Sequence, residues 1–220
     1  MRACAALLAW SIAVGALAQG STVRVEGIAA IVGANTPRAD AKVILRSDVD
    51  FRARLRLIRE APGQPHLGEL PRGLLRATLD ELIGEALIAR EAERVQVATP
   101  TSADIRRERE RLEQLAGGAE SFAALVRALG SSERELEAMS RQRALVSVFL
   151  EANLEGAATV SDARIDAVFA SGEHPFLGQE LEDVRGAMRV WLTREALDAA
   201  VTRWIQVLRE RTRVRELAGY

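Results

Sequence analysis

Residues 28–50, IAAIVGANTPRADAKVILRSDVD, decide how the folded chain begins. Two short apolar runs, at 28–32 and 43–45, flank a polar loop that contains Pro37. Apolar runs separated by turn-forming residues predict a β-hairpin. Because an isolated two-stranded hairpin is only marginally stable in water, a segment distant in sequence must cover it.

The residues after the hairpin predict two amphipathic helices. Ser47 and Asp50 have the spacing of a capping box, which predicts a helix that runs to about Arg59. Its apolar face consists of Phe51, Leu55 and Ile58. Pro71 suits the first turn of a second helix. The clearest apolar stripe in the chain belongs to this helix and consists of Leu75, Leu79, Leu82, Ile83, Ala86 and Leu87. We expect this second helix at the centre of the core.

Four further helices are marked by start and stop signals before the chain reaches residue 171. Capping boxes at 101–104 and 132–135 predict the starts of the third and fifth helices. A short fourth helix at 122–129 follows the Gly-Gly pair at 117–118, which ends the third helix. A sixth helix begins at 159–162.

The last predicted helix, 181–210, leads to a segment with strand character. Its apolar stripe slips near Glu195, which predicts a bend or a break there. Residues 212–217 accept β structure and lack a helical apolar face. Since chain ends often lie close together in one domain, we expect this segment to return to the hairpin as a third strand. The predicted fold class is therefore mainly α, with a small antiparallel β-sheet formed by the N-terminal hairpin and a C-terminal strand.

The first 18 residues resemble a secretory signal peptide. Arg2 precedes an apolar run, and residues 16–18 have the A-x-A form of a cleavage site. The run is shorter than the ~20 residues that cross a bilayer, and a retained anchor is the alternative. Cleavage after Ala18 would remove Cys4, the only cysteine, so the mature chain would have no disulfide. We expect residues 19–220 to form a single domain stabilised by its core.

The composition argues against nucleic acid as a partner. The net charge is −1, and arginines alternate with glutamates along the helices. A nucleic-acid-binding domain is typically basic over one face. The hydrophobic fraction of 48% is enough for a core.

Taken in order, the segments resemble the N-terminal chaperone module of the SurA and PpiD family of periplasmic chaperones. The resemblance rests on the hairpin, on LLRATLDELIGEALIAREAERVQV at 74–97, and on the helix starts TSADI, SSEREL and TVSDARI. It ends with WLTREALDAAVTRWIQVLRERTRVREL at 191–217, and departs from the family pattern in the longer hairpin loop at 34–41. The resemblance implies an N-terminal part, 23–170, closed by a C-terminal helix and strand at 180–217.

In that family a parvulin-type prolyl isomerase domain commonly precedes the closing helix. Here the same interval is the loop 171–179, which is far shorter than the ~50 residues of a small domain. The two histidines, His66 and His174, lie in proline-containing loops and are expected to be surface residues. No phosphate-binding loop, His-Glu-x-x-His or Gly-x-Ser-x-Gly motif occurs. We therefore expect no catalytic residue, cofactor or metal ion.

The resemblance implies an ATP-independent holdase of the periplasm whose clients are unfolded outer-membrane or periplasmic proteins. Such clients expose strands that alternate apolar and polar residues. The candidate client-binding side chains are Phe51, Leu55, Phe122, Met139, Phe176 and Trp191. Core packing is the alternative for Trp191 and Trp204, which lie on a helical stripe. Two other functions remain open, an adaptor that recognises one fixed partner and, least favoured, a prolyl isomerase.

Overall fold

The computed structural model describes residues 26–35, 41–60, 67–96, 99–154 and 159–220. It confirms a mainly helical fold with a small three-stranded antiparallel sheet. The elements are β1 (Ile28–Val32), β2 (Lys42–Leu45), α1 (Arg46–Glu60), α2 (Arg72–Val95), α3 (Ser102–Leu115), α4 (Ala119–Leu129), α5 (Glu133–Leu154), α6 (Asp162–Ser171), α7 (Leu181–Arg211) and β3 (Val214–Glu216). The predicted signal peptide at 1–18 lies outside the described residues.

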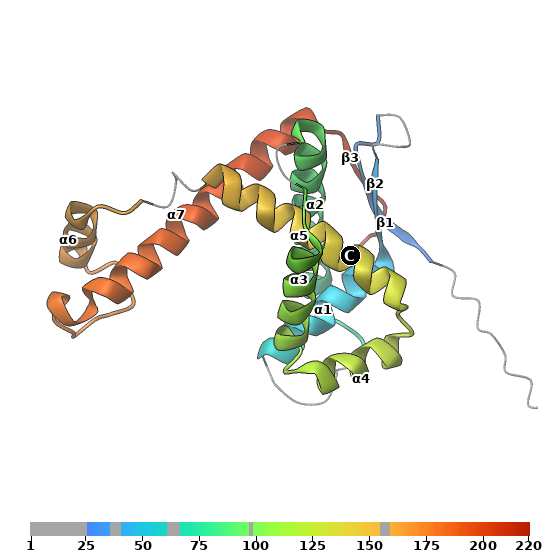
Figure 1. Cartoon of the computed structure of the whole chain (residues 1–220), viewed down its shortest axis with the longest axis horizontal. Helices are drawn as coiled ribbons and strands as arrows, with labels where there is room; N and C mark the ends of the chain where they lie inside the picture. The colour runs from blue at the N-terminus through green and yellow to red at the C-terminus, as the bar shows by residue number, and fades with distance from the viewer. Residues whose placement is uncertain (1–25, 36–40, 61–66, 97–98, 155–158) are drawn as a thin grey trace, which may run out of the picture.

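Two parts can be distinguished in Figure 1. The body contains α1–α5, the sheet and the second half of α7. The arm, residues 159–192, contains α6 and the first half of α7 and extends away from the body. The long helix α7 therefore belongs to both parts and connects them.

The sheet joins the two ends of the described chain, as the opening hairpin required. Its strand order is β2-β1-β3, with both pairs antiparallel. The amide of Gly33 donates to the carbonyl oxygen of Arg213 at 2.9 Å, and the amide of Leu217 donates to that of Ala29 at 2.8 Å. The C-terminal strand thus covers one edge of β1. Helix α2 packs against one face of the sheet.

Helix α2 lies at the centre of the largest core cluster, as its apolar stripe predicted. Leu79, Ile83 and Leu87 are almost completely buried, together with sheet residues such as Val32. Gly84 lets α7 approach closely, because a Cβ atom at this position would lie 2.9 Å from Cδ1 of Ile205. A side chain at this position would require the end of the Ile205 side chain to shift.

The predicted capping box at the start of α1 is wrong. The helix begins at Arg46, and the amide of Leu45 donates to Oδ2 of Asp48 at 2.8 Å. Asp50 instead accepts from Nε of Arg54 at 2.8 Å, one turn further along. The strand enters the helix without a loop, so the acceptor needed at the junction lies two residues earlier than the predicted one.

The third and fifth helices begin with the predicted caps. The Thr101 amide donates to Oδ2 of Asp104 at 2.7 Å, and the Asp104 amide donates back to the Thr101 hydroxyl. The same reciprocal pair joins Ser132 and Glu135 at the start of α5. Gly117 has a φ of +84°, a left-handed conformation that suits glycine and ends α3 as predicted.

Helix α7 is continuous from Leu181 to Arg211, so of the predicted bend or break near Glu195 the break is wrong. The apolar residues of α7 form two groups, which pack in two different core clusters. Met188 and Leu192 pack against α6 in the arm, whereas Trp204 and Leu208 pack in the body. The Trp204 ring lies 5.1 Å from that of Phe149 on α5. The stripe slips because the helix passes from one partner to another.

Candidate functional site

A cleft separates β2 and the second half of α2 from the first half of α5. It consists of two adjoining cavities, which we call the outer and the inner cavity. The outer cavity has a volume of about 830 Å³ and the inner cavity about 260 Å³. Both are lined by Lys42, Ala138 and Gln142, so they form one continuous cleft.

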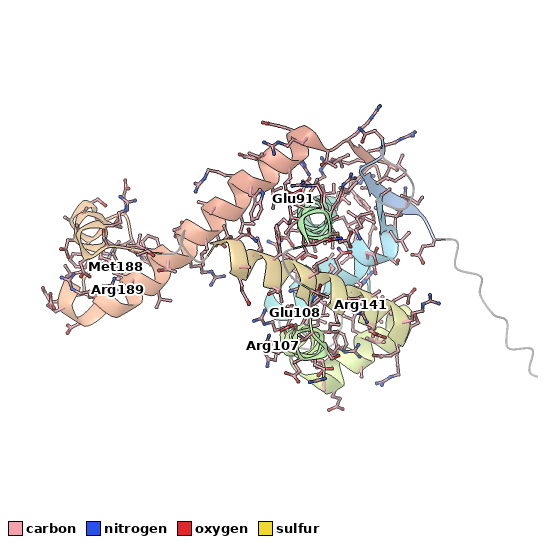
Figure 2. All side chains as sticks on the ribbon, turned by 45° about the horizontal axis from the view of Figure 1, so that its top comes forward. Glu91, Arg107, Glu108, Arg141, Met188 and Arg189 are labelled. Carbon is pink, nitrogen blue, oxygen red and sulfur yellow. The ribbon has the colours of Figure 1, made fainter. Side chains whose placement is uncertain are left out.

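The outer cavity has a charged rim. Lys42, the only lysine of the chain, contacts Oε1 of Glu93 at 2.6 Å, and Arg141 contacts Oε1 of Glu137 at 2.9 Å. Figure 2 shows Arg141 on α5. Arg134 also lines this cavity and forms no ion pair with any described residue. The rim is thus mostly neutralised in pairs.

The inner cavity combines an apolar wall with buried charge. Its apolar lining consists mainly of Ile44, Leu82, Ala86 and Met139. Asp48 and Arg52 line it as well. Burial raises the pKa of the Asp48 carboxyl above its ordinary value, although the hydrogen bond from the Leu45 amide opposes this shift.

A network of buried ion pairs supports the inner cavity from behind. Glu85 on α2 accepts from Arg52 at 2.6 Å and from Arg143 at 3.2 Å. Arg143 also reaches Oε2 of Glu108, which is 3% exposed and accepts from Arg111 at 2.6 Å. Figure 2 shows Glu108 where α3 meets α5. The network therefore ties α1, α2, α3 and α5 together.

Burial affects two arginines of this network, Arg143 and Arg52. Burial, together with the nearby positive charge of Arg52, lowers the pKa of Arg143 below its ordinary value. Nη1 of Arg52 is buried and has no hydrogen-bond partner among the described residues. A buried donor without an acceptor costs free energy, so a bound carbonyl oxygen or water at this atom would be stabilising.

The strand edge that faces the cleft carries backbone groups that have no strand partner among the described residues. Ala29 on β1, and Gly33 directly after this strand, form hydrogen bonds on the β3 side of the sheet, so the alternation along β1 directs Ala30 and Val32 toward β2. Their partners on β2 are Ile44 and Lys42. The N–H and C=O of Val43 consequently point away from the sheet, toward the cleft.

The arm has its own small core. Val184, Met188 and Leu192 on α7 pack against Ile165 and Val168 on α6. Figure 2 shows Met188 and Arg189 next to each other on this outlying part of α7. Leu177 and Val190 are 71% and 72% exposed, respectively. The arm thus presents some apolar surface of its own.

The six candidate client-binding residues do not form one site. Phe51, Leu55 and Phe122 are buried together in a core cluster of the body, and the rings of Phe51 and Phe122 meet edge to face at 6.0 Å. Their burial leaves no surface for a client, so we do not retain them in the site.

The other three candidates are at least partly accessible. Met139 lines the inner cavity, whereas Phe176 and Trp191 lie half-buried in the arm. Val43 was not among the candidates, although it lies half-exposed at the edge of the cleft. Its position at the free edge follows only from the strand pairing. In the sequence, the apolar run at 43–45 was the available signal for this strand.

In the loop 171–179, the His174 ring packs between the rings of Phe169 and Phe176. The His174 ring stacks on Phe169 with a centroid distance of 4.8 Å, and its Nδ1 accepts from the Phe176 amide. These contacts give the histidine a structural role. His66 lies outside the described residues.

Among the described residues, no group of three or more His, Cys, Asp or Glu side chains is placed to hold a metal ion. No described helix combines the length and apolar character needed to cross a membrane.

No protein-family model matches the sequence, and no curated protein is significantly similar to it.

Proposed function

We propose that the protein is an ATP-independent chaperone that holds unfolded exported proteins, with the cleft beside β2 as its main binding surface. The observation that carries the proposal is the continuous cleft of two cavities next to an unpaired strand edge. The resemblance to the SurA and PpiD family supports it and favours outer-membrane or periplasmic proteins as clients. The signal-like residues 1–18 support a periplasmic location.

Holding an unfolded protein needs no chemical step, only a surface that competes with aggregation. The inner cavity offers apolar side chains from three elements, and the paired charges of the outer rim keep the empty cleft soluble. The ion-pair network holds the walls in place before a client arrives. A preorganised surface loses less entropy when it binds.

The arm provides a second contact for long clients. It lies at a distance from the cleft and carries the exposed side chains of Leu177 and Val190. A polypeptide bound at two linked surfaces dissociates more slowly than one bound at either surface alone. We assign no catalytic step to the protein, since the loop 171–179 has only the structural histidine contacts described above.

The experiment that tests this proposal measures light scattering of several unrelated unfolded proteins diluted from urea, with and without the purified protein and without nucleotide. We expect scattering to fall at near-stoichiometric ratios for all of them. If no client is protected while a single partner is captured tightly, the chain is an adaptor. Acceleration of proline-limited refolding in proportion to the protein added would instead indicate an isomerase.

A further inference from the structure

The two edges of the sheet are protected to different degrees. At the outer edge, β3 presents exposed charges, among them Arg215 and Glu216, and Glu216 is paired with Arg76 at 2.8 Å. Charged residues of this kind block pairing with another strand. At the other edge, β2 has one charge, on Lys42, which is paired with Glu93, followed by the half-exposed Val43. Within the described sheet, the edge at β2 is therefore the one open to further pairing.

The free edge of β2 faces a wall rather than open solvent. Ala138, Met139 and Gln142 of α5 line the same cavity as residues 42–45. The inner cavity lies between this wall and the strand. A second folded copy would have to place its own sheet in the space next to α5. The geometry therefore favours an extended segment of another polypeptide as the occupant.

We propose that the client binds as a fourth strand, paired with the free edge of β2 through the N–H and C=O of Val43. This inference rests on the proposed function and specifies how its main surface works. The client residue opposite Val43 exchanges both backbone hydrogen bonds with it. Recognition of a backbone in this way needs no particular client sequence.

The pleat of the added strand determines which client side chains enter the cleft. Val43 and Ile44 point to opposite faces of the sheet, and Ile44 is 5% exposed because it faces the helices. In the added strand, one client residue lies opposite Val43. The client residues directly before and after it therefore point to the helical face of the sheet, over Leu82, Ala86 and Met139. The inner cavity accordingly prefers segments with apolar residues at every second position.

Arg52 adds a polar contact to the same cavity. Its Nη2 donates to Glu85 at 2.6 Å, whereas its buried Nη1 lacks an acceptor among the described residues. A client carbonyl oxygen would supply that acceptor if the Arg52 side chain, which lines the cavity, turned its buried Nη1 toward the client. An unfolded chain carries such an oxygen at every residue, so this contact is also independent of the client sequence.

Proline at position 43 tests the pairing directly. Val43→Pro removes the N–H that points into the cleft and leaves the bonds between β2 and β1 intact, and proline is tolerated on strand edges. Glu216→Pro is the matched control, because its N–H points outward at the opposite edge by the same alternation. Val43→Ala keeps the N–H and shortens only the side chain.

The probe is a fluorescent octapeptide that alternates valine and serine, with binding measured by anisotropy. We expect Val43→Pro to weaken binding by about tenfold or more, because it loses a hydrogen bond and imposes a clash on the added strand. Val43→Ala should weaken binding less, and Glu216→Pro should leave it unchanged. Thermal unfolding of each variant verifies that the fold is kept.

Four results would overturn the inference. The first is unchanged peptide affinity in a folded Val43→Pro variant. The second is equal loss of affinity in Val43→Pro and Glu216→Pro. The third is a dimer in solution that Val43→Pro dissociates, which would make a second copy the occupant. If Val43→Pro protects unfolded clients as well as the original protein does, the proposed function stands and the strand pairing is wrong.

Discussion

Removal of the buried carboxylate of Glu108 should destabilise the body strongly. Glu108 is 3% exposed and is the acidic partner of two arginines, Arg111 at 2.6 Å and Arg143 at 3.3 Å. In Glu108→Ala, Arg143 keeps only Glu85, at 3.2 Å. Breaking a buried ion pair by removing one partner costs about 3–5 kcal/mol. Because Arg111 is 54% exposed and Arg143 retains one partner, we expect about 3 kcal/mol.

The matched control is Glu137→Ala on α5. Glu137 pairs with Arg141 at 2.9 Å, but both side chains are 59% exposed. Exposed pairs of this kind contribute about 0.2–1 kcal/mol. Unfolding by urea, followed by circular dichroism, compares the two variants on one scale. A loss below about 1 kcal/mol in Glu108→Ala, or equal losses in both variants, would refute a stabilising role for the network.

Three other changes test the fold and its electrostatics. Deletion of residues 212–220 removes β3 and exposes one edge of β1. The deletion should cost several of the ~5–15 kcal/mol that stabilise a domain. An unchanged melting temperature would show that β3 contributes nothing to stability. Leu82→Ala removes a side chain that is 7% exposed and should cost about 2–5 kcal/mol in the same urea assay, whereas a loss under about 0.5 kcal/mol would mean that the inner cavity is wider than the structure shows. Asp48 has a raised pKa in the folded state, so its contribution to stability is present below its ordinary pKa of 3.8 and is lost as the pH rises through the raised value. The variant Asp48→Asn keeps an acceptor for the Leu45 amide. Over that rise in pH, its free energy of unfolding should therefore increase relative to that of the original protein. A difference between the two free energies that stays constant with pH would contradict the burial of this carboxyl.

Local signals in the sequence were sufficient for most helix boundaries. The capping boxes at Thr101 and Ser132 need only a side chain and an amide three residues apart, so the sequence contains the whole interaction. The third strand was predicted for a different reason, because a lone hairpin needs a cover. The cap of α1 was misplaced because the strand runs directly into the helix, which no local pattern indicates.

Whether the candidate residues line a common surface depends on tertiary structure. Phe51 and Phe122 are aromatic residues on amphipathic helices, and the sequence does not say whether such a face meets a client or another helix. In the structure they meet each other. The exposure of Val43 follows from the order of the strands, because the C-terminal strand pairs with β1 and leaves β2 at the edge. Met139 was the one candidate that the structure places in the cleft.

The most direct test of the central claim is a cross-link between the cleft and an unfolded client. Lys42 is the only lysine and lies at the junction of both cavities, so an amine-reactive photo-cross-linker can be placed there. Lys42→Arg controls for labelling of the terminal amine. The account predicts cross-links from Lys42 to several unrelated unfolded proteins and none to the same proteins when folded. Protection of clients from aggregation without any cross-link from Lys42 would show that they bind elsewhere, and would contradict the account.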